Sequence, residues 1–141
     1  MQIDQEGINF IKSVEGVVSK VYADSRGLPT IGVGHLVLPQ DGLVLDQTIS
    51  EEQVDNFLQQ DLAKAEKSIN KLTVIDQLNQ NQYNALVSWC FNIGCAAAEC
   101  STVFKELNNN NFDAVPAALL MWSKPASIIG RRKREVTLWK S

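Results

Sequence analysis

The sequence predicts an α+β fold in which a long helix joins a small β-hairpin lobe near the N-terminus to a larger helical lobe. Three observations predict it. Extended, glycine-rich chain is confined to residues 18–35, where β-favouring residues flank a Ser-Arg-Gly turn. Most of the remaining sequence repeats apolar residues at helical spacing. A capping box at residues 50–53 opens an apolar stripe long enough to connect two lobes.

The first helix is predicted over residues 4–15, because Ile8 and Ile11 recur at helical spacing and Asp4 can cap the start. The long helix should run from the capping box to about Lys71. Further helices are predicted over 79–91, 102–107 with Ser101 as cap, 113–122 with Asp113 as cap, and 130–139.

A chain of 141 residues has the length of one ordinary domain, and we expect a single domain over residues 1–141. The lobes should comprise about 14–50 and 72–141, with a connecting helix over about 51–71. We expect the helix over 4–15 to pack on the helical lobe. A cleft between two such lobes is the natural place for a ligand.

Composition excludes several classes of function. With 45% hydrophobic and 21% charged residues, the chain suits a folded soluble domain, and no apolar run approaches the roughly 20 residues of a membrane span. A net charge of −3 argues against a general nucleic-acid binder, although Arg131–Arg134 form a basic cluster. The first residues lack the features of a signal peptide, so we expect synthesis in a host cytoplasm.

Two carboxylates in contrasting positions suggest acid–base chemistry. Glu15 ends an apolar helix, where burial would favour its protonated form, whereas Asp24 lies in a hairpin turn, where water and backbone N–H groups would keep it ionised. Hydrolysis of a glycosidic bond needs such a pair, one group to protonate the leaving oxygen and one ionised. Taken alone, the same two residues also fit an ordinary helix end and an ordinary turn.

The whole segment is more specific. Glu15, Asp24 and Thr30, followed directly by Ile-Gly-Val-Gly-His over residues 31–35, have fixed intervals that resemble the catalytic segment of phage-type lysozymes, glycoside hydrolase family 24. Trp-Cys-Phe-Asn-Ile-Gly over 89–94, Ser-Thr-Val-Phe-Lys-Glu-Leu-Asn over 101–108 and the arginine-rich segment 130–135 resemble further parts of that family. The resemblance therefore covers nearly the full chain.

The resemblance implies a role for each matching residue. Glu15 would be the general acid, with Asp24 and Thr30 holding the attacking water and supporting positive charge on the sugar. The residues that would line the sugar cleft are Leu36, Phe91 and Asn92. The supporting residues would be Arg131, paired with the catalytic Glu15, and His35, paired with Asp61 on the long helix.

The implied function is an endo-acting muramidase that hydrolyses the β-1,4 bond between N-acetylmuramic acid and N-acetylglucosamine in peptidoglycan and so lyses cells. No metal and no cofactor are implied. The alternatives are a lytic transglycosylase acting on the same bond and a catalytically silent wall-binding module. We expect a monomer that binds glycan strands, without nucleic acid or stable membrane insertion, and that reaches the periplasm or wall with help from a holin or a secretion machinery.

Other features have no fixed place in this pattern. The three cysteines Cys90, Cys95 and Cys100 are odd in number and lack metal-site spacing, so we expect buried free thiols and no disulfide. The tryptophans Trp89, Trp122 and Trp139 are expected in the core, with stacking on sugar as the alternative. Residues 124–127 differ from the glycine-rich segment of many family members, which leaves the shape of that cleft edge open.

Overall fold

The computed structural model describes all 141 residues, which form two compact units. One unit comprises residues 8–61, and the other comprises residues 1–7 and 62–141. The chain contains seven α-helices and one three-stranded sheet, so the predicted α+β class is confirmed. None of the helices combines the length and the apolarity that crossing a lipid bilayer requires.

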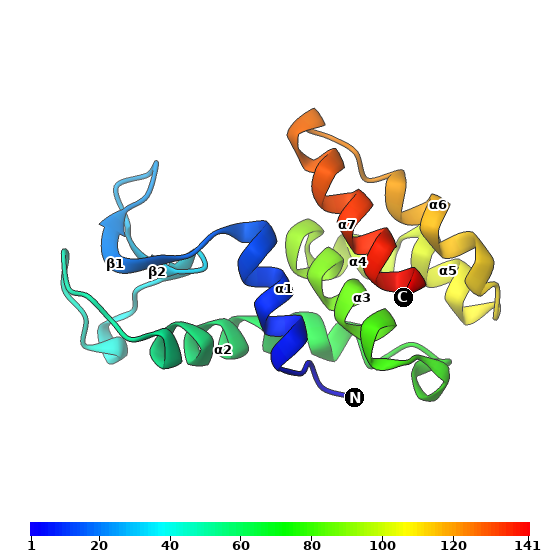
Figure 1. Ribbon diagram of the computed structural model, residues 1–141, viewed down its shortest axis with the longest axis horizontal. Helices are drawn as coiled ribbons and strands as arrows, with labels where there is room; N and C mark the ends of the chain where they lie inside the picture. Colours follow the sequence, from blue (N-terminus) through cyan, green and yellow to red (C-terminus); the bar gives the residue numbers. More distant parts are fainter. The chain divides into compact units, whose positions relative to one another are not determined.

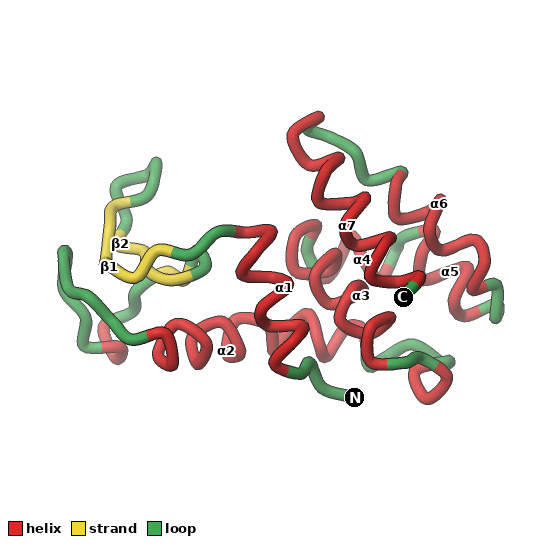
Figure 2. The backbone as a smooth tube through the Cα atoms, in the orientation of Figure 1, coloured by secondary structure: helices red, strands yellow, loops and turns green.

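The sheet lies within the unit of residues 8–61 (Figure 2). Its antiparallel strands are β1 (Val18–Ala23), β2 (Pro29–Gly32) and β3 (His35–Leu36), in the order β1-β2-β3. A tight turn joins β1 to β2, where the Gly27 amide donates to the Asp24 carbonyl at 2.9 Å and Gly27 has φ of 78°. This left-handed conformation is accessible to glycine without strain, which explains the residue at that position.

Two helices contribute to this unit. Helix α1 (Gln5–Glu15) and helix α2 (Glu51–Ile69) begin as predicted, because Asp4 accepts from the Gly7 amide and the Ser50–Gln53 capping box forms in both directions. Lys12 of α1 pairs with Glu51 at 3.2 Å and with Asp55 at 2.8 Å. The buried apolar residues within residues 8–61 are Ile8, Ile11, Val21, Ile31, Val33, Ile49, Val54 and Leu58.

The other unit is helical. It contains α3 (Gln80–Ile93), α4 (Cys95–Glu99), α5 (Thr102–Asn108), α6 (Val115–Leu120) and α7 (Ile129–Lys140). Helices α3 and α7 pack side by side along much of their length (Figure 1). The fully buried side chains of this unit include Tyr83, Leu86, Trp89, Leu107 and Leu119.

The structure departs from prediction in the helical unit. Asp113 does not cap a helix, because it lies inside a 3₁₀ turn (Phe112–Ala114), and α6 ends at Leu120. Helix α4 was not predicted. Gly94, with φ of 97°, ends α3, and the run of alanines that follows begins a new helix.

Two expectations about buried side chains are only partly correct. Cys90 is buried, but Cys95, the first residue of the short helix α4, is half-buried, and Cys100, which follows that helix, is exposed; all three are free thiols. Trp89 and Trp139 belong to the core, whereas Trp122 is half-buried at the edge of a pocket.

Candidate active site

Asp24 occupies the turn between β1 and β2, and the turn itself holds its carboxylate. Oδ1 accepts hydrogen bonds from the backbone amides of Arg26 at 2.8 Å and Leu28 at 3.0 Å. Oδ2 accepts from Nε of Arg26 at 3.2 Å and from its Nη2 at 2.9 Å. The hydrogen bond from the Leu28 amide is the largest cause that lowers the pKa of Asp24 below its ordinary value; burial opposes it, and the contacts with Arg26 add to the lowering. The predicted backbone N–H contacts of Asp24 are therefore confirmed, whereas its catalytic role stays a prediction.

Thr30 lies on β2, and its side chain is buried. Its hydroxyl donates to the carbonyl of Leu28 at 3.1 Å, the residue whose amide binds Asp24. Thr30 faces Tyr22 across the sheet on one side and Leu36 on the other. Leu36, predicted to contact sugar, is 40% exposed on β3 and presents an apolar surface beside Thr30.

Glu15 is the last residue of α1. The helix ends there because Gly16 adopts φ of 82° and its amide caps the Lys12 carbonyl at 2.9 Å. The predicted burial of Glu15 is wrong, because its side chain is exposed and the following valines, Val17 and Val18, are also exposed. The apolar stripe of α1 indicates which face is buried, but it does not indicate whether other chain segments cover the helix end.

His35 forms the predicted pair with Asp61 and a second pair that was not predicted. Nδ1 lies 2.8 Å from Oδ2 of Asp61, and Nε2 lies 2.9 Å from Oδ2 of Asp41. The ring stacks on Phe57 with 4.3 Å between centroids. Asp41 reaches the ring from a 3₁₀ turn (Pro39–Asp41), where its carboxylate also accepts from the Leu38 amide.

These contacts perturb both partners. Burial works against protonation of His35, but the hydrogen bonds to Asp41 and Asp61 outweigh it and raise the pKa of His35. Burial likewise works against ionisation of Asp41, but the Leu38 amide and His35 outweigh it and lower the pKa of Asp41. The two contacts therefore favour an imidazolium held between two carboxylates, which ties β3 to the middle of α2 and to the turn at residues 39–41.

Phe91 and Asn92, predicted to line the sugar cleft, lie in the last turn of α3. Phe91 is half-buried and Asn92 is exposed. The side-chain oxygen of Asn92 accepts from Nη2 of Arg132, which fixes the orientation of the amide. Nε of Arg132 donates to the Trp122 carbonyl at 3.0 Å, so one guanidinium joins α3, α7 and the chain after α6.

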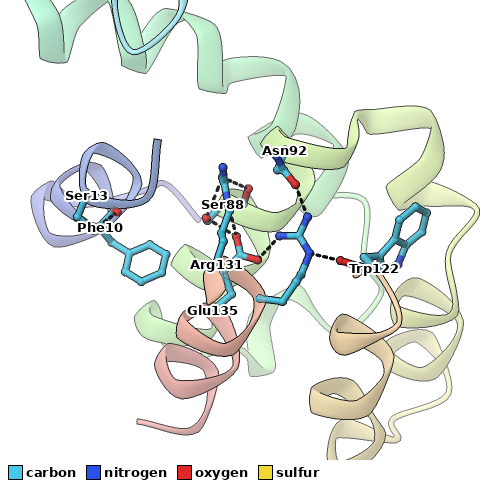
Figure 3. Close-up of polar contacts among 8 residues, drawn as sticks. Phe10, Ser13, Ser88, Asn92, Trp122, Arg131 and Glu135 are labelled. Atoms are coloured by element: carbon cyan, nitrogen blue, oxygen red, sulfur yellow. Dashed lines mark hydrogen bonds and ion pairs between the residues drawn. The ribbon is translucent and has the colours of Figure 1, made fainter. Parts of the chain in front are cut away.

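Arg131 and Arg132 are buried, and they share a buried carboxylate, Glu135 (Figure 3). Arg131 contacts Oε2 of Glu135 at 3.1 Å, and Arg132 contacts Oε1. Ser88 donates to Oε2 at 2.5 Å, and its carbonyl accepts from Arg131 at 2.9 Å. The pairing of Arg131 with Glu15 stays a prediction.

Sequence reasoning missed Arg26, Asp41 and Glu135. A weak signal existed for Arg26, which stands two residues after Asp24 in the same turn. Glu135 follows Arg131 by four residues on one helix face, a spacing at which opposite charges pair. No local sequence feature indicated Asp41, because its contact with His35 depends on how the turn at residues 39–41 folds over the ring. No group of three or more His, Cys, Asp or Glu side chains is placed to hold a metal ion.

Comparison with known proteins agrees with this geometry. The profile of the phage lysozyme family matches residues 12–135. The endolysin of Salmonella phage P22 is 42% identical over 146 aligned residues, covering 100% of this chain and 99% of that protein. A crystal structure of a P22 lysozyme mutant superposes with a TM-score of 0.92 and the same coverage. An endolysin from Escherichia coli O157:H7 phage FAHEc1, 31% identical, has a TM-score of 0.87 and covers 99% of this chain and 93% of its own.

A small sheet that carries a held carboxylate and hydroxyl, with a helical unit of this fold, defines an enzyme of the lysozyme class, a glycoside hydrolase. The chain belongs to the phage lysozyme family. This membership confirms the predicted family, the predicted fold and the predicted activity of hydrolysing peptidoglycan to lyse cells.

Proposed function

We propose that the enzyme cleaves its substrate by a single displacement in which Glu15 protonates the leaving oxygen while Asp24 and Thr30 hold the attacking water. The bond is the β-1,4 linkage between N-acetylmuramic acid and N-acetylglucosamine, cut within the strand. The observation that carries this proposal is the shared anchoring of Asp24 and Thr30 on Leu28, which sets an ionised carboxylate and a hydroxyl at fixed positions one hairpin turn apart.

The hydrogen bonds suggest how these groups bind water. The Thr30 hydroxyl donates its hydrogen to the Leu28 carbonyl, so its oxygen remains available to accept a hydrogen bond from water. A carboxylate has about four acceptor sites, and at Asp24 two of them take backbone amides and two take the Arg26 guanidinium. Water at Oδ2 therefore requires Arg26 to move, which its 70% exposed side chain permits.

Glu15 is accessible to the glycan strand, as a proton donor to a polymer must be. Its exposed carboxyl can be reached by a large polymer, and binding of the glycan excludes water from it at the moment of reaction. In the proposed complex, Leu36, Phe91 and Asn92 contact the sugars, Arg131 pairs with Glu15, and residues 1–141 act as one lysozyme domain with lobes over about 14–50 and 72–141. The helix over residues 4–15 packs on the helical lobe in this arrangement.

We further propose that the enzyme works as a monomer, is made in a host cytoplasm, and acts on glycan strands once a holin or a secretion machinery gives it access to the wall.

The test is Glu15→Gln, which removes the proton donor and keeps the size of the side chain. We expect loss of lysis of purified walls by at least about 100-fold, because general acid catalysis contributes roughly 10²–10⁴-fold. Glu6→Gln is the matched control, since Glu6 is exposed on the first turn of the same helix. Thermal melting of each preparation verifies folding. Full activity in a folded Glu15→Gln variant would contradict the proposed mechanism.

A further inference from the structure

The guanidinium of Arg26 engages only one oxygen of the Asp24 carboxylate. Its Nε lies 3.2 Å and its Nη2 lies 2.9 Å from the same atom, Oδ2. The other oxygen, Oδ1, is occupied by the backbone amides of Arg26 and Leu28. A bidentate pair, which uses both carboxylate oxygens, is the stronger arrangement. A second carboxylate with two free oxygens would therefore be a better partner for Arg26 than Asp24 is.

Arg26 can leave Asp24 at low cost. Its side chain is 70% exposed, and ion pairs in contact with solvent contribute little to stability. After its departure Asp24 would keep the backbone amides of Arg26 and Leu28, at 2.8 and 3.0 Å, so the orientation of the carboxylate does not depend on the guanidinium. The departure also opens Oδ2 to the water that the proposed reaction requires.

The charge of the surrounding unit indicates which kind of group Arg26 would meet. Residues 8–61 contain eight aspartates and glutamates but only three lysines and arginines, which are Lys12, Lys20 and Arg26. Lys12 contacts two carboxylates of α2, and Lys20 pairs with Asp46. A unit with this excess of negative charge repels an anionic substrate unless a cation meets the anion. Arg26, in the turn between β1 and β2, is the cation placed beside the proposed site.

We propose that Arg26 exchanges the Asp24 carboxylate for a free carboxylate of the peptide attached to the glycan strand, and so makes the enzyme prefer walls with anionic peptides. This inference rests on the proposed function, because the oxygen of Asp24 that is freed is the one that would hold the attacking water. In an intact strand the lactyl carboxyl of N-acetylmuramic acid is consumed in the amide bond to the peptide. The free carboxylates are therefore those of the peptide.

Binding to purified peptidoglycan tests the exchange, with the same material after amidation of its carboxylates as the second substrate. The measurement uses Glu15→Gln as background, so that the strands are not cut during sedimentation. Arg26→Gln removes the charge, and Arg26→Lys retains it. Lys20→Gln is the matched control, because Lys20 is another exposed cation of the sheet with a carboxylate partner. Thermal melting verifies that each variant is folded.

We expect Arg26→Gln to weaken binding to native peptidoglycan about fivefold and to leave binding to the amidated material unchanged. Arg26→Lys should still bind the native material better, and Lys20→Gln should match the background on both. With Glu15 restored, the ratio of kcat/KM on native to amidated walls should fall about fivefold in Arg26→Gln. Added salt should reduce the preference of the parent for native walls.

An equal effect of Arg26→Gln on both materials would overturn the proposal, since Arg26 would then serve only Asp24. No effect on either material would also overturn it, as would loss of the preference in Arg26→Lys. Failure of the proposed mechanism would be recognised separately, because Glu15→Gln would then still cut the strands, whatever the Arg26 variants bind.

Discussion

Asp24 and Thr30 are hydrogen-bonded to the same residue, Leu28, the carboxylate to its amide at 3.0 Å and the hydroxyl to its carbonyl at 3.1 Å. The relative position of the two side chains is therefore set by one peptide segment of the hairpin, not by packing between distant elements. A local cause of this kind explains why the interval between the two residues is a specific signal in the sequence.

Asp24→Asn tests whether catalysis needs the charge of Asp24, because the substitution removes the charge and keeps the turn. Asparagine keeps the oxygen that accepts from the Arg26 and Leu28 amides, so the turn should form and the melting temperature should stay close to that of the parent. Wall lysis should fall about 100-fold or more, because the neutral amide cannot orient water or support positive charge on the sugar. Asp113→Asn, at another exposed turn, should be fully active. Near-parental lysis by Asp24→Asn would exclude the proposed role.

Arg26→Gln tests the second contact of Asp24. Arg26 helps to lower the pKa of Asp24, so its removal should raise that pKa toward the ordinary value. The proposed reaction needs ionised Asp24, and the acid limb of kcat/KM against pH should therefore move to higher pH. Lys20→Gln, an exposed change on β1, should leave the limb in place. An acid limb that does not move in Arg26→Gln would show that Asp24 does not set it.

The His35 clamp should make stability depend on pH at both ends. Because the folded pKa of His35 is raised, its contribution is complete below about 6.5, the ordinary value, and is lost as the pH rises through the folded pKa. Because the folded pKa of Asp41 is lowered, its contribution is present above about 3.9 and is lost as the pH falls through the folded pKa. Between about pH 3.9 and pH 6.5, His35 and Asp41 therefore both stabilise the folded state.

Urea unfolding at a series of pH values measures this dependence. In His35→Gln the decline of the unfolding free energy above pH 6.5 should disappear, and no other histidine can replace it, because His35 is the only one in the chain. Asp41→Asn should weaken the decline of the unfolding free energy both at high pH and at low pH. An identical pH profile for the parent and His35→Gln would refute the clamp.

Substitution of Glu135 should strongly destabilise the helical unit. It is fully buried between Arg131 and Arg132, and Glu135→Gln would leave both buried guanidiniums without their shared counter-charge. We expect a loss of about 3 kcal/mol, or roughly 10 °C in melting temperature. Lys133→Ala, an exposed change on the same helix, should stay within about 0.5 kcal/mol. A melting temperature unchanged by Glu135→Gln would mean that the network adds nothing to stability.

The stereochemistry of the product tests the proposed single displacement. An inverting enzyme leaves about 6.5–9.5 Å between its two carboxyl groups for water, whereas a retaining enzyme holds them about 5–5.5 Å apart. With Thr30 and Asp24 holding a water, the first-formed product should be the α-anomer. Proton NMR during the first turnovers distinguishes the two, and an initial β-anomer would rule out direct attack by water.

The sequence alone determined the features that depend on neighbouring residues. Helix α1, the capping box of α2, the hairpin with Asp24 in its turn, and the break at Gly94 all follow from local backbone preferences and short-range hydrogen bonds. The interval Glu15–Asp24–Thr30 was equally informative, because a single hairpin fixes two of its three members.

Only the tertiary structure decided the features that depend on distant segments. The exposure of Glu15 was predicted wrongly, since an apolar helix stripe does not reveal what covers the helix end. Asp41 joins His35 through a turn, and Glu135 meets Ser88 from another helix, so neither pairing had a periodic signal. Burial and the resulting pKa shifts come from the sum of all neighbours in space, and that sum is fixed only when the chain is packed.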